Sequence, residues 1–371
     1  MNAIEELRLL LRPPAGGLYL VSTGAAAQRA VQRRIYGVDD DAAVQTRFEA
    51  GLARIGEAKA VILSVPSDVG AGFVRGANLG GQAIREALLD AVPDWPSRLE
   101  RAGIVDVGDV FVVPQLLSDD MLSVEQIRDT RRAIYPAVDP SDRQTLPVSP
   151  LSIAERALAR IFECNPRVVP FILGGDHSVA WPVVAALSRA RSDPWGIVQF
   201  DAHTDLLDQR LGVRICFGTW SFHANELLGR RGRLVQVGIR ATRFPQSHWE
   251  GLLGVRQFWA TECARSPSGT IAAIVDHLHA AGVTSLYVTN DIDGTDDSFA
   301  DATGTPEPGG LTPDFVVALI RALRAAFPFC AADLVEVAPM LERSAGGRER
   351  TLATSVRYVR ETLSCIAGQE L

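Results

Sequence analysis

Cysteine is scarce in this chain, and its arrangement excludes two kinds of site. The 371 residues include five cysteines, and no two of them form a CxxC pair. Their odd number and wide spacing argue against a disulfide framework and against a zinc site built from thiolates. We therefore expect Cys164, Cys216, Cys263, Cys330 and Cys365 to be free thiols in a reducing compartment.

Long basic runs and long apolar runs are also absent. The formal net charge is -7, so we expect no nucleic-acid partner. Near the N terminus, Glu5 and Glu6 precede a short apolar stretch that contains Arg8 and Arg12, which fits neither a secretory signal nor a membrane span. We expect a cytoplasmic protein with no membrane partner. The 47% hydrophobic content is enough for a large core, which excludes a disordered or fibrous protein.

Short apolar runs alternate with helical patterns along most of the chain, which is typical of an α/β fold with a mainly parallel sheet. The predicted strands are Ala60 to Val65, Gly103 to Val107, Val168 to Leu173, Gly196 to Phe200, Arg233 to Ile239, Ser285 to Thr289 and Ala332 to Val337. The clearest predicted helices are Gly81 to Val92, Ser152 to Cys164, Ser178 to Ala190, Thr270 to Ala281, Pro313 to Ala326 and Thr351 to Ile366.

Two stretches interrupt this alternation. They are the first ~55 residues and residues 111–150, which are rich in Asp, Ser and Pro. We interpret them as an N-terminal extension and an inserted excursion, so that the chain forms one α/β domain.

Polar residues follow directly after three of the predicted strands. The first segment, 174–178 (Gly-Gly-Asp-His-Ser), precedes a helix, where Asp176 or Ser178 could simply act as a cap. In the second segment, 201–205 (Asp-Ala-His-Thr-Asp), Asp201, His203 and Asp205 occupy alternate positions and can converge on one point. Buried together without a cation, the two carboxylates would repel each other.

The third segment, 290–293 (Asn-Asp-Ile-Asp), adds two more carboxylates after a strand. Alone it could be a solvated turn, but one metal site explains all three segments, because loops at the carboxyl ends of parallel strands converge. Four carboxylates and two imidazoles suit two divalent cations, and this mixture of donors favours Mn²⁺ over thiophilic metals. A water that bridges two such ions, about 3.5–4 Å apart, loses a proton near neutral pH and becomes a nucleophile.

In this order, the three segments resemble signatures of the arginase/agmatinase/formimidoylglutamase family, the ureohydrolases. Residues 303–311 (Thr-Gly-Thr-Pro-Glu-Pro-Gly-Gly-Leu) add a fourth match, and the stretch from Val65 to Arg85 resembles the family's opening strand and helix. The resemblance begins at about Ala58, so we expect an extension over residues 1–57 and a ureohydrolase domain over 58–371. It implies a three-layer α/β/α fold with about eight strands, and a homo-oligomer that is usually a trimer or a hexamer.

The resemblance also implies a role for each polar residue. Two divalent ions are expected, Mn²⁺ or alternatively Ni²⁺. Six residues would hold them: His177, Asp201, Asp205 and Asp291 for the first ion, and Asp201, His203, Asp291 and Asp293 for the second. Glu336 resembles the carboxylate that receives the guanidinium group in two parallel hydrogen bonds; the alternative is an exposed Glu at a strand end.

The chain departs from the family around the expected substrate mouth. Many members have a His-Gly-Thr stretch whose His is thought to transfer protons, but residues 216–219 here are Cys-Phe-Gly-Thr. Phe217 cannot carry a proton, so His223 is the candidate for proton transfer, unless it is a structural residue at a helix start. The loop with which arginases grip an amino-acid backbone is not evident before Phe217, which argues against arginine. Residues 294–297 (Gly-Thr-Asp-Asp) and the pair at 346–347 (Gly-Gly) also depart from the usual pattern.

Aromatic residues follow the second metal segment closely. If Phe217 and Trp220 bind substrate at the mouth, together with Phe222, they favour a compact substrate such as guanidine over arginine or formiminoglutamate. The alternative is that Trp220 and Phe222 are core residues at a helix start.

The leading hypothesis is hydrolysis of a C–N bond in a guanidino compound, such as agmatine, a guanidino acid or guanidine, with release of urea or ammonia. A formimidoylglutamase that acts on an amidine is the second hypothesis. The third is a metal-binding subunit that has lost catalysis and serves in regulation or assembly. The sequence alone leaves open the substrate, the native metal and the role of the extension.

Overall fold

A single sheet runs through the computed structural model, which describes residues 1–20 and 22–371. In the described part of the chain the sheet has nine strands, in the order β1-β3-β2-β4-β9-β8-β5-β6-β7. Their bounds are β1 (Leu11–Arg12), β2 (Ala60–Ser64), β3 (Ile104–Val110), β4 (Val169–Leu173), β5 (Trp195–Phe200), β6 (Leu234–Ile239), β7 (Arg256–Trp259), β8 (Ser285–Asn290) and β9 (Phe329–Leu334). Eight strands are parallel to their neighbours, and β1 is antiparallel to β3.

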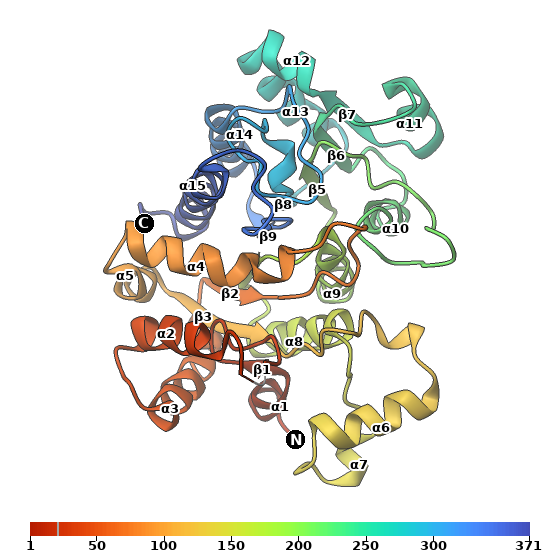
Figure 1. The fold of residues 1–371 in the computed structure, drawn as a ribbon. Helices are drawn as coiled ribbons and strands as arrows, with labels where there is room; N and C mark the ends of the chain where they lie inside the picture. Colours follow the sequence, from red (N-terminus) through yellow and green to blue (C-terminus); the bar gives the residue numbers. More distant parts are fainter. Residues whose placement is uncertain (21) are drawn as a thin grey trace.

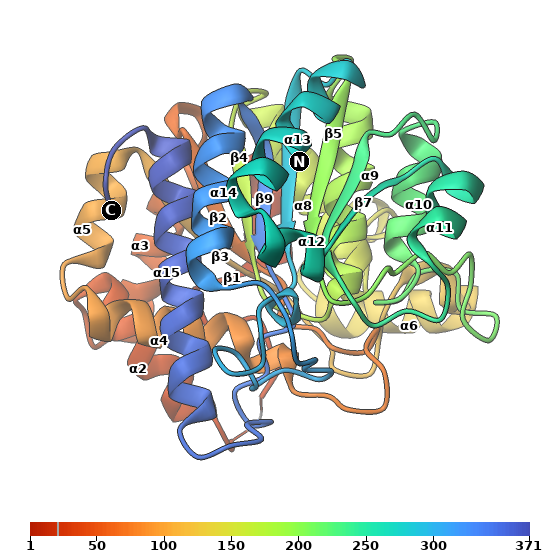
Figure 2. The same cartoon turned by 90° about the horizontal axis from the view of Figure 1, so that it is seen from above.

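Helices cover both faces of the sheet and produce three layers (Figures 1 and 2). One face packs against α1 (Ala3–Leu10), α3 (Asp41–Leu52), α8 (Pro150–Cys164), α9 (Ala180–Ala190), α10 (Trp220–Leu227) and α11 (Gln246–Leu253). The other packs against α2 (Ala25–Tyr36), α4 (Gly80–Ala91), α5 (Trp95–Ala102), α12 (Ala260–Arg265), α13 (Pro267–Ala280), α14 (Pro313–Ala326) and α15 (Gly347–Ala367). Two further helices, α6 (Val124–Ile134) and α7 (Pro140–Arg143), have no buried residues.

The buried strands explain why the apolar runs are nearly continuous. In β2, Val61 and Leu63 belong to the core on one face, whereas Ala60 and Ile62 belong to the core on the other. Successive side chains of a strand point to opposite faces, so a strand covered on both sides needs apolar residues at every position. The predicted α/β/α fold with a mainly parallel sheet of about eight strands is confirmed.

The two stretches that interrupt the sequence pattern contain regular structure. The described residues up to Leu52 include α1, β1, α2 and α3, and Leu7, Leu10 and Phe48 of this stretch are buried in the core. Residues 111–150 contain α6 and α7. The short edge strands β1 and β7 were not predicted, because two and four residues are too few to show a periodic pattern.

Two sequence-based expectations concern the whole chain. All five cysteines are free thiols, as expected. No helix in the described ranges 1–20 and 22–371 is long and apolar enough to cross a membrane.

Candidate metal centre

Four central strands end at one edge of the sheet and bring the polar segments together. Strands β4, β9, β8 and β5 are neighbours in this order, although they are far apart in the chain. At their carboxyl ends lie four polar segments: the 3-10 helix η4 (His177–Val179) after β4, residues 201–205 after β5, the 3-10 helix η5 (Ile292–Gly294) after β8, and Glu336 after β9. The carboxyl edge of a parallel sheet is the usual place for a ligand site.

A first group of ligand atoms converges on His177. Its Nδ1 atom lies 3.2 Å from Oδ2 of Asp201, 3.2 Å from Oδ2 of Asp205 and 3.2 Å from Oδ2 of Asp291. The other ring nitrogen, Nε2, lies 3.0 Å from Thr289 Oγ1. Although Nδ1 is buried, it makes no hydrogen bond of acceptable geometry with any of these carboxylates. Three carboxylate oxygens therefore surround an imidazole nitrogen that has no hydrogen-bond partner in the described part of the chain.

A second group lies beside the first and shares Asp201 with it. His203 Nδ1 is 3.1 Å from Oδ2 of Asp293 and 3.6 Å from Oδ1 of Asp201. The two oxygens of Asp201 thus face different groups. Asp291 lies in the first group, and its Oδ1 accepts a hydrogen bond of 2.9 Å from the backbone N–H of Asp293.

Crowding of the carboxylates changes how readily each one ionises. Burial raises the pKa of Asp291 well above its usual value, and the neighbouring Asp293 and Asp201 raise it further. Burial and the Asp201 charge raise the pKa of Asp205 to about 6. Asp201 differs, because the nearby His177 and His203 side chains outweigh burial and lower its pKa. The protein side chains alone do not neutralise this cluster.

The carboxylates in turn shift the pKa values of the two histidines, His177 and His203. Burial lowers the pKa of His177, but the surrounding carboxylates raise it to well above its usual value. Similarly, the nearby Asp293 outweighs burial and raises the pKa of His203 to about 12. The cluster therefore favours positive charge at the position of the imidazole nitrogens. Oxygen donors with two imidazoles, and an orphaned Nδ1 on His177, fit a pair of divalent cations.

Trp220 lies against this cluster, but it is not at the mouth. It has no exposed surface, its Nε1 donates a 3.1 Å hydrogen bond to Oδ2 of Asp205, and its ring centroid is 4.6 Å from that of His177. Asp205 itself has a φ of 52°, in the left-handed region that residues other than glycine adopt uncommonly. Trp220 thus helps to hold Asp205, a placement that agrees with the core alternative for this side chain.

Glu336 is a buried carboxylate without a cationic partner among the described residues. It is 8% exposed, and its Oε1 accepts a 2.9 Å hydrogen bond from the backbone N–H of His177. Its backbone is strained, with a φ of 61°, just after β9 ends. Burial raises its pKa well above the usual value, and the nearby Asp176 adds to this rise. The exposed alternative for Glu336 does not fit this burial.

Phe217 and His223 lie on the loop and helix that follow the ligand segment 201–205. The Phe217 ring is partly exposed and packs beneath the guanidinium of Arg210, 4.9 Å from its Cζ. His223 Nε2 lies 2.9 Å from the carbonyl of Asp208 and 3.1 Å from that of Arg214. These contacts favour the alternative in which His223 is structural, because its Nε2 atom already contacts two backbone carbonyls of the preceding loop.

Sequence reasoning overlooked three residues that contact the predicted ligands. They are Thr289, which contacts His177; Gln199, which donates to Asp201; and Arg240, which donates to the backbone carbonyls of Asp293 and Glu307. Thr289 and Gln199 could have been found from the sequence, because each is a polar residue inside an otherwise apolar buried strand. A polar side chain in that place requires a hydrogen-bond partner.

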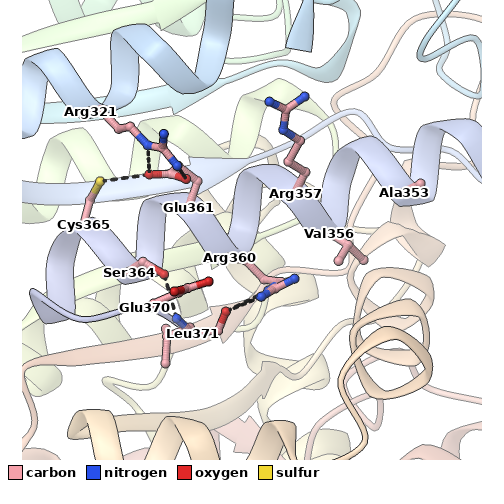
Figure 3. Close-up of a pocket in the computed structure, with 10 residues that line it drawn as sticks. All are labelled: Arg321, Ala353, Val356, Arg357, Arg360, Glu361, Ser364, Cys365, Glu370 and Leu371. Carbon is pink, nitrogen blue, oxygen red and sulfur yellow. Dashed lines mark hydrogen bonds and ion pairs between the residues drawn. The ribbon is translucent and has the colours of Figure 1, made fainter. Parts of the chain in front are cut away.

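A groove elsewhere on the surface does not compete as a functional site. It has a volume of about 580 Å³ and lies between α14, α15 and residues 370–371 (Figure 3). Two of its charged side chains are paired within the groove: Arg321 with Glu361, and Arg360 with the backbone oxygen of Leu371. None of the predicted ligands lines it.

Comparisons with known proteins agree with this geometry. Residues 58–365 match the Arginase family. The mitochondrial agmatinase of Gallus gallus is 31% identical over 297 residues, which cover 77% of this chain and 75% of that protein. The guanidinobutyrase of Pseudomonas aeruginosa is 28% identical over 316 residues, covering 83% and 86%. The solved structure of proclavaminate amidino hydrolase from Streptomyces clavuligerus has a TM-score of 0.61 at 27% identity, covering 83% of this chain and 91% of its own. The chain therefore belongs to the arginase family, the ureohydrolases.

Proposed function

We propose that this protein hydrolyses a C–N bond of a small guanidino compound, namely agmatine, a guanidino acid or guanidine, and releases urea or ammonia. The observation that carries the proposal is the convergence of three carboxylate oxygens at 3.2 Å around His177 Nδ1, directly beside the unpaired carboxylate of Glu336. The carboxylates around His177 suit metal cations, and the carboxylate of Glu336 suits an organic cation.

Six side chains would hold the two ions. His177, Asp201, Asp205 and Asp291 form the first set, and Asp201, His203, Asp291 and Asp293 form the second. Mn²⁺ is the proposed metal, with Ni²⁺ as the alternative, because no thiolate belongs to either group of ligand atoms. Such ions, when bound, activate water at neutral pH and offset negative charge that develops on the substrate.

Glu336 would bind the guanidinium group of the substrate. Among the residues that the structure describes, its buried carboxylate has no Arg or Lys partner, so a planar cation can satisfy it through charge-assisted hydrogen bonds. Because Oε1 is already bound to the N–H of His177, the substrate is fixed relative to a metal ligand. This arrangement would orient the guanidinium carbon toward the metal site before reaction.

The substrate panel that tests the proposal contains agmatine, short guanidino acids, guanidine, arginine and formiminoglutamate. The purified protein is loaded with Mn²⁺ or Ni²⁺, and urea, ammonia and formamide are measured. We expect urea or ammonia from a compact guanidino compound. Formamide from formiminoglutamate would favour the amidine hydrolase, and two bound ions without turnover of any compound would favour the regulatory subunit.

The arrangement of the whole chain is part of the same proposal. Residues 58–371 would form the catalytic domain, with residues 1–57 as an extension. We also propose a trimeric or hexameric assembly in the cytoplasm. Light scattering of the purified protein and localisation of the tagged chain test these two points.

A further inference from the structure

Three glutamines lie side by side inside the sheet. Gln199 of β5 is in register with Gln236 of β6, and Gln236 is in register with Gln257 of β7. Figure 1 shows these strands next to one another at one side of the sheet. All three side chains have 0% exposure. A buried amide is costly unless it is hydrogen-bonded, so its partners indicate why it is there.

The side chains form one continuous chain of hydrogen bonds that ends on a proposed metal ligand. Trp259 Nε1 donates to Gln257 Oε1 at 3.1 Å, and Gln257 Nε2 donates to Gln236 Oε1 at 2.8 Å. Gln236 Nε2 then donates to Gln199 Oε1 at 2.9 Å. Finally, Gln199 Nε2 donates to Asp201 Oδ2 at 2.7 Å. We refer to Gln199, Gln236 and Gln257 as the glutamine chain.

The two ends of the glutamine chain fix its direction. The indole N–H of Trp259 can only donate, and an ionised Asp201 carboxylate can only accept. Each amide between them must therefore turn its NH₂ group toward Asp201. Hydrogen bonds aligned in this way polarise one another, and in a buried site they place partial positive charge beside the carboxylate.

Two side branches tie the glutamine chain to its surroundings. Gln199 Oε1 also accepts a 2.8 Å hydrogen bond from Ser221 Oγ on α10. Gln236 Nε2 also donates to the backbone carbonyl of Thr204, which lies within the ligand segment 201–205. The network therefore holds both the Asp201 carboxylate and the backbone of its loop.

We propose that the glutamine chain positions Asp201 for metal binding, with Gln199 as the positioning residue in direct contact with it. The inference rests on the proposed function, because Asp201 is the carboxylate whose two oxygens face both ligand groups. Gln199 orients the carboxylate between these groups and restricts its rotation when no ion is bound. It acts through Asp201 and does not contact substrate.

Titration of the metal-free full-length protein with Mn²⁺ tests the proposal without any substrate. Gln199→Met keeps the length of the side chain but removes the donor to Asp201. Because loss of a residue that orients a ligand typically costs 10–100-fold in metal affinity, we expect the Mn²⁺ Kd to rise by at least roughly tenfold. Trp259→Phe removes only the first donor of the chain, and we expect a smaller rise, about two- to threefold.

Trp249→Phe is the matched control, because Trp249 donates to Thr242 Oγ1, outside the glutamine chain. We expect it to bind Mn²⁺ like the wild type. Trp259 is only partly buried, so Trp259→Phe keeps the test available if Gln199→Met does not fold. Suppose that the wild type binds two ions and that every folded variant of the glutamine chain binds Mn²⁺ as tightly as the wild type. This result would overturn the role of the glutamine chain and leave the proposed function intact. A wild type that binds no Mn²⁺ or Ni²⁺ would overturn the proposed function as well.

Discussion

The backbone N–H of His177 donates a 2.9 Å hydrogen bond to Oε1 of Glu336, although the two residues are 159 positions apart in the chain. One residue is a proposed metal ligand, and the other is the proposed acceptor of the guanidinium group. Under the proposed function, the bond would couple the position of the substrate to that of the metal centre. Because strands β4 and β9 are neighbours, their loops can maintain this contact.

Replacement of Glu336 by Gln should impair substrate use without loss of metal. The change keeps the shape of the side chain and removes the charge that faces the guanidinium, so we expect kcat/KM to fall by at least about tenfold. Steady-state kinetics and metal analysis measure the two effects. Glu342→Gln, an exposed change in the same loop, is the control. An unchanged kcat/KM would show that Glu336 does not bind the guanidinium group.

Asp201→Asn and Asp291→Asn should each abolish turnover and reduce the metal content. We expect close to two divalent ions per wild-type chain, and fewer in either variant, because removal of a shared carboxylate loosens both ions. Elemental analysis after gel filtration gives the stoichiometry. The exposed Asp208→Asn is the matched control and should retain both ions. Full activity in metal-free wild-type protein would contradict the whole assignment.

Metal should stabilise the protein more as the pH rises from 5 to 7.5. The pKa of Asp205 is about 6 and that of His203 about 12, both above their ordinary values of 3.8 and 6.5. The metal-free folded state therefore holds more protons than the unfolded state, so its stability falls as the pH rises through this range. Bound ions replace these protons, and the gain in Tm on adding Mn²⁺ should increase with pH. A gain that is constant or decreases across this range, measured by calorimetry, would contradict the expectation.

Trp220→Phe should weaken metal binding. The variant keeps an aromatic ring against His177 but loses the donor to Asp205, and we expect the Mn²⁺ Kd to rise by roughly tenfold. Trp220→Ala is less informative, because truncation of a fully buried tryptophan typically costs about 3–5 kcal/mol of stability. Trp249→Phe again serves as the control. If Trp220→Phe binds Mn²⁺ as tightly as the wild type, the indole N–H has no part in holding Asp205.

His223→Ala should lower Tm and leave the pH dependence of kcat unchanged. The reason is that His223 Nε2 already contacts the carbonyls of Asp208 and Arg214, so its loss frees a loop and removes no proton carrier. Thermal unfolding and a pH–rate profile separate the two roles. Loss of one ionisation from the profile, with an unchanged Tm, would instead support proton transfer by His223.

The local sequence determined the elements and the nature of the site. Apolar runs of five or six residues predict buried parallel strands, and the helix expected from Pro313 to Ala326 has those bounds. The alternate spacing of Asp201, His203 and Asp205 indicated a metal site before any contact was known. These features can be predicted from the sequence because periodicity and residue chemistry are local properties of the chain.

Only the tertiary structure decided which segments meet. The order β4-β9-β8-β5 is not the order of the chain, and it places Glu336 beside His177, although the two residues are 159 positions apart. The tertiary structure also buries Trp220 against Asp205. In addition, it joins Gln199, Gln236 and Gln257 by hydrogen bonds across three strands. Each of these outcomes depends on strand order and register, which arise from packing between residues far apart in the chain and leave no periodic trace in it.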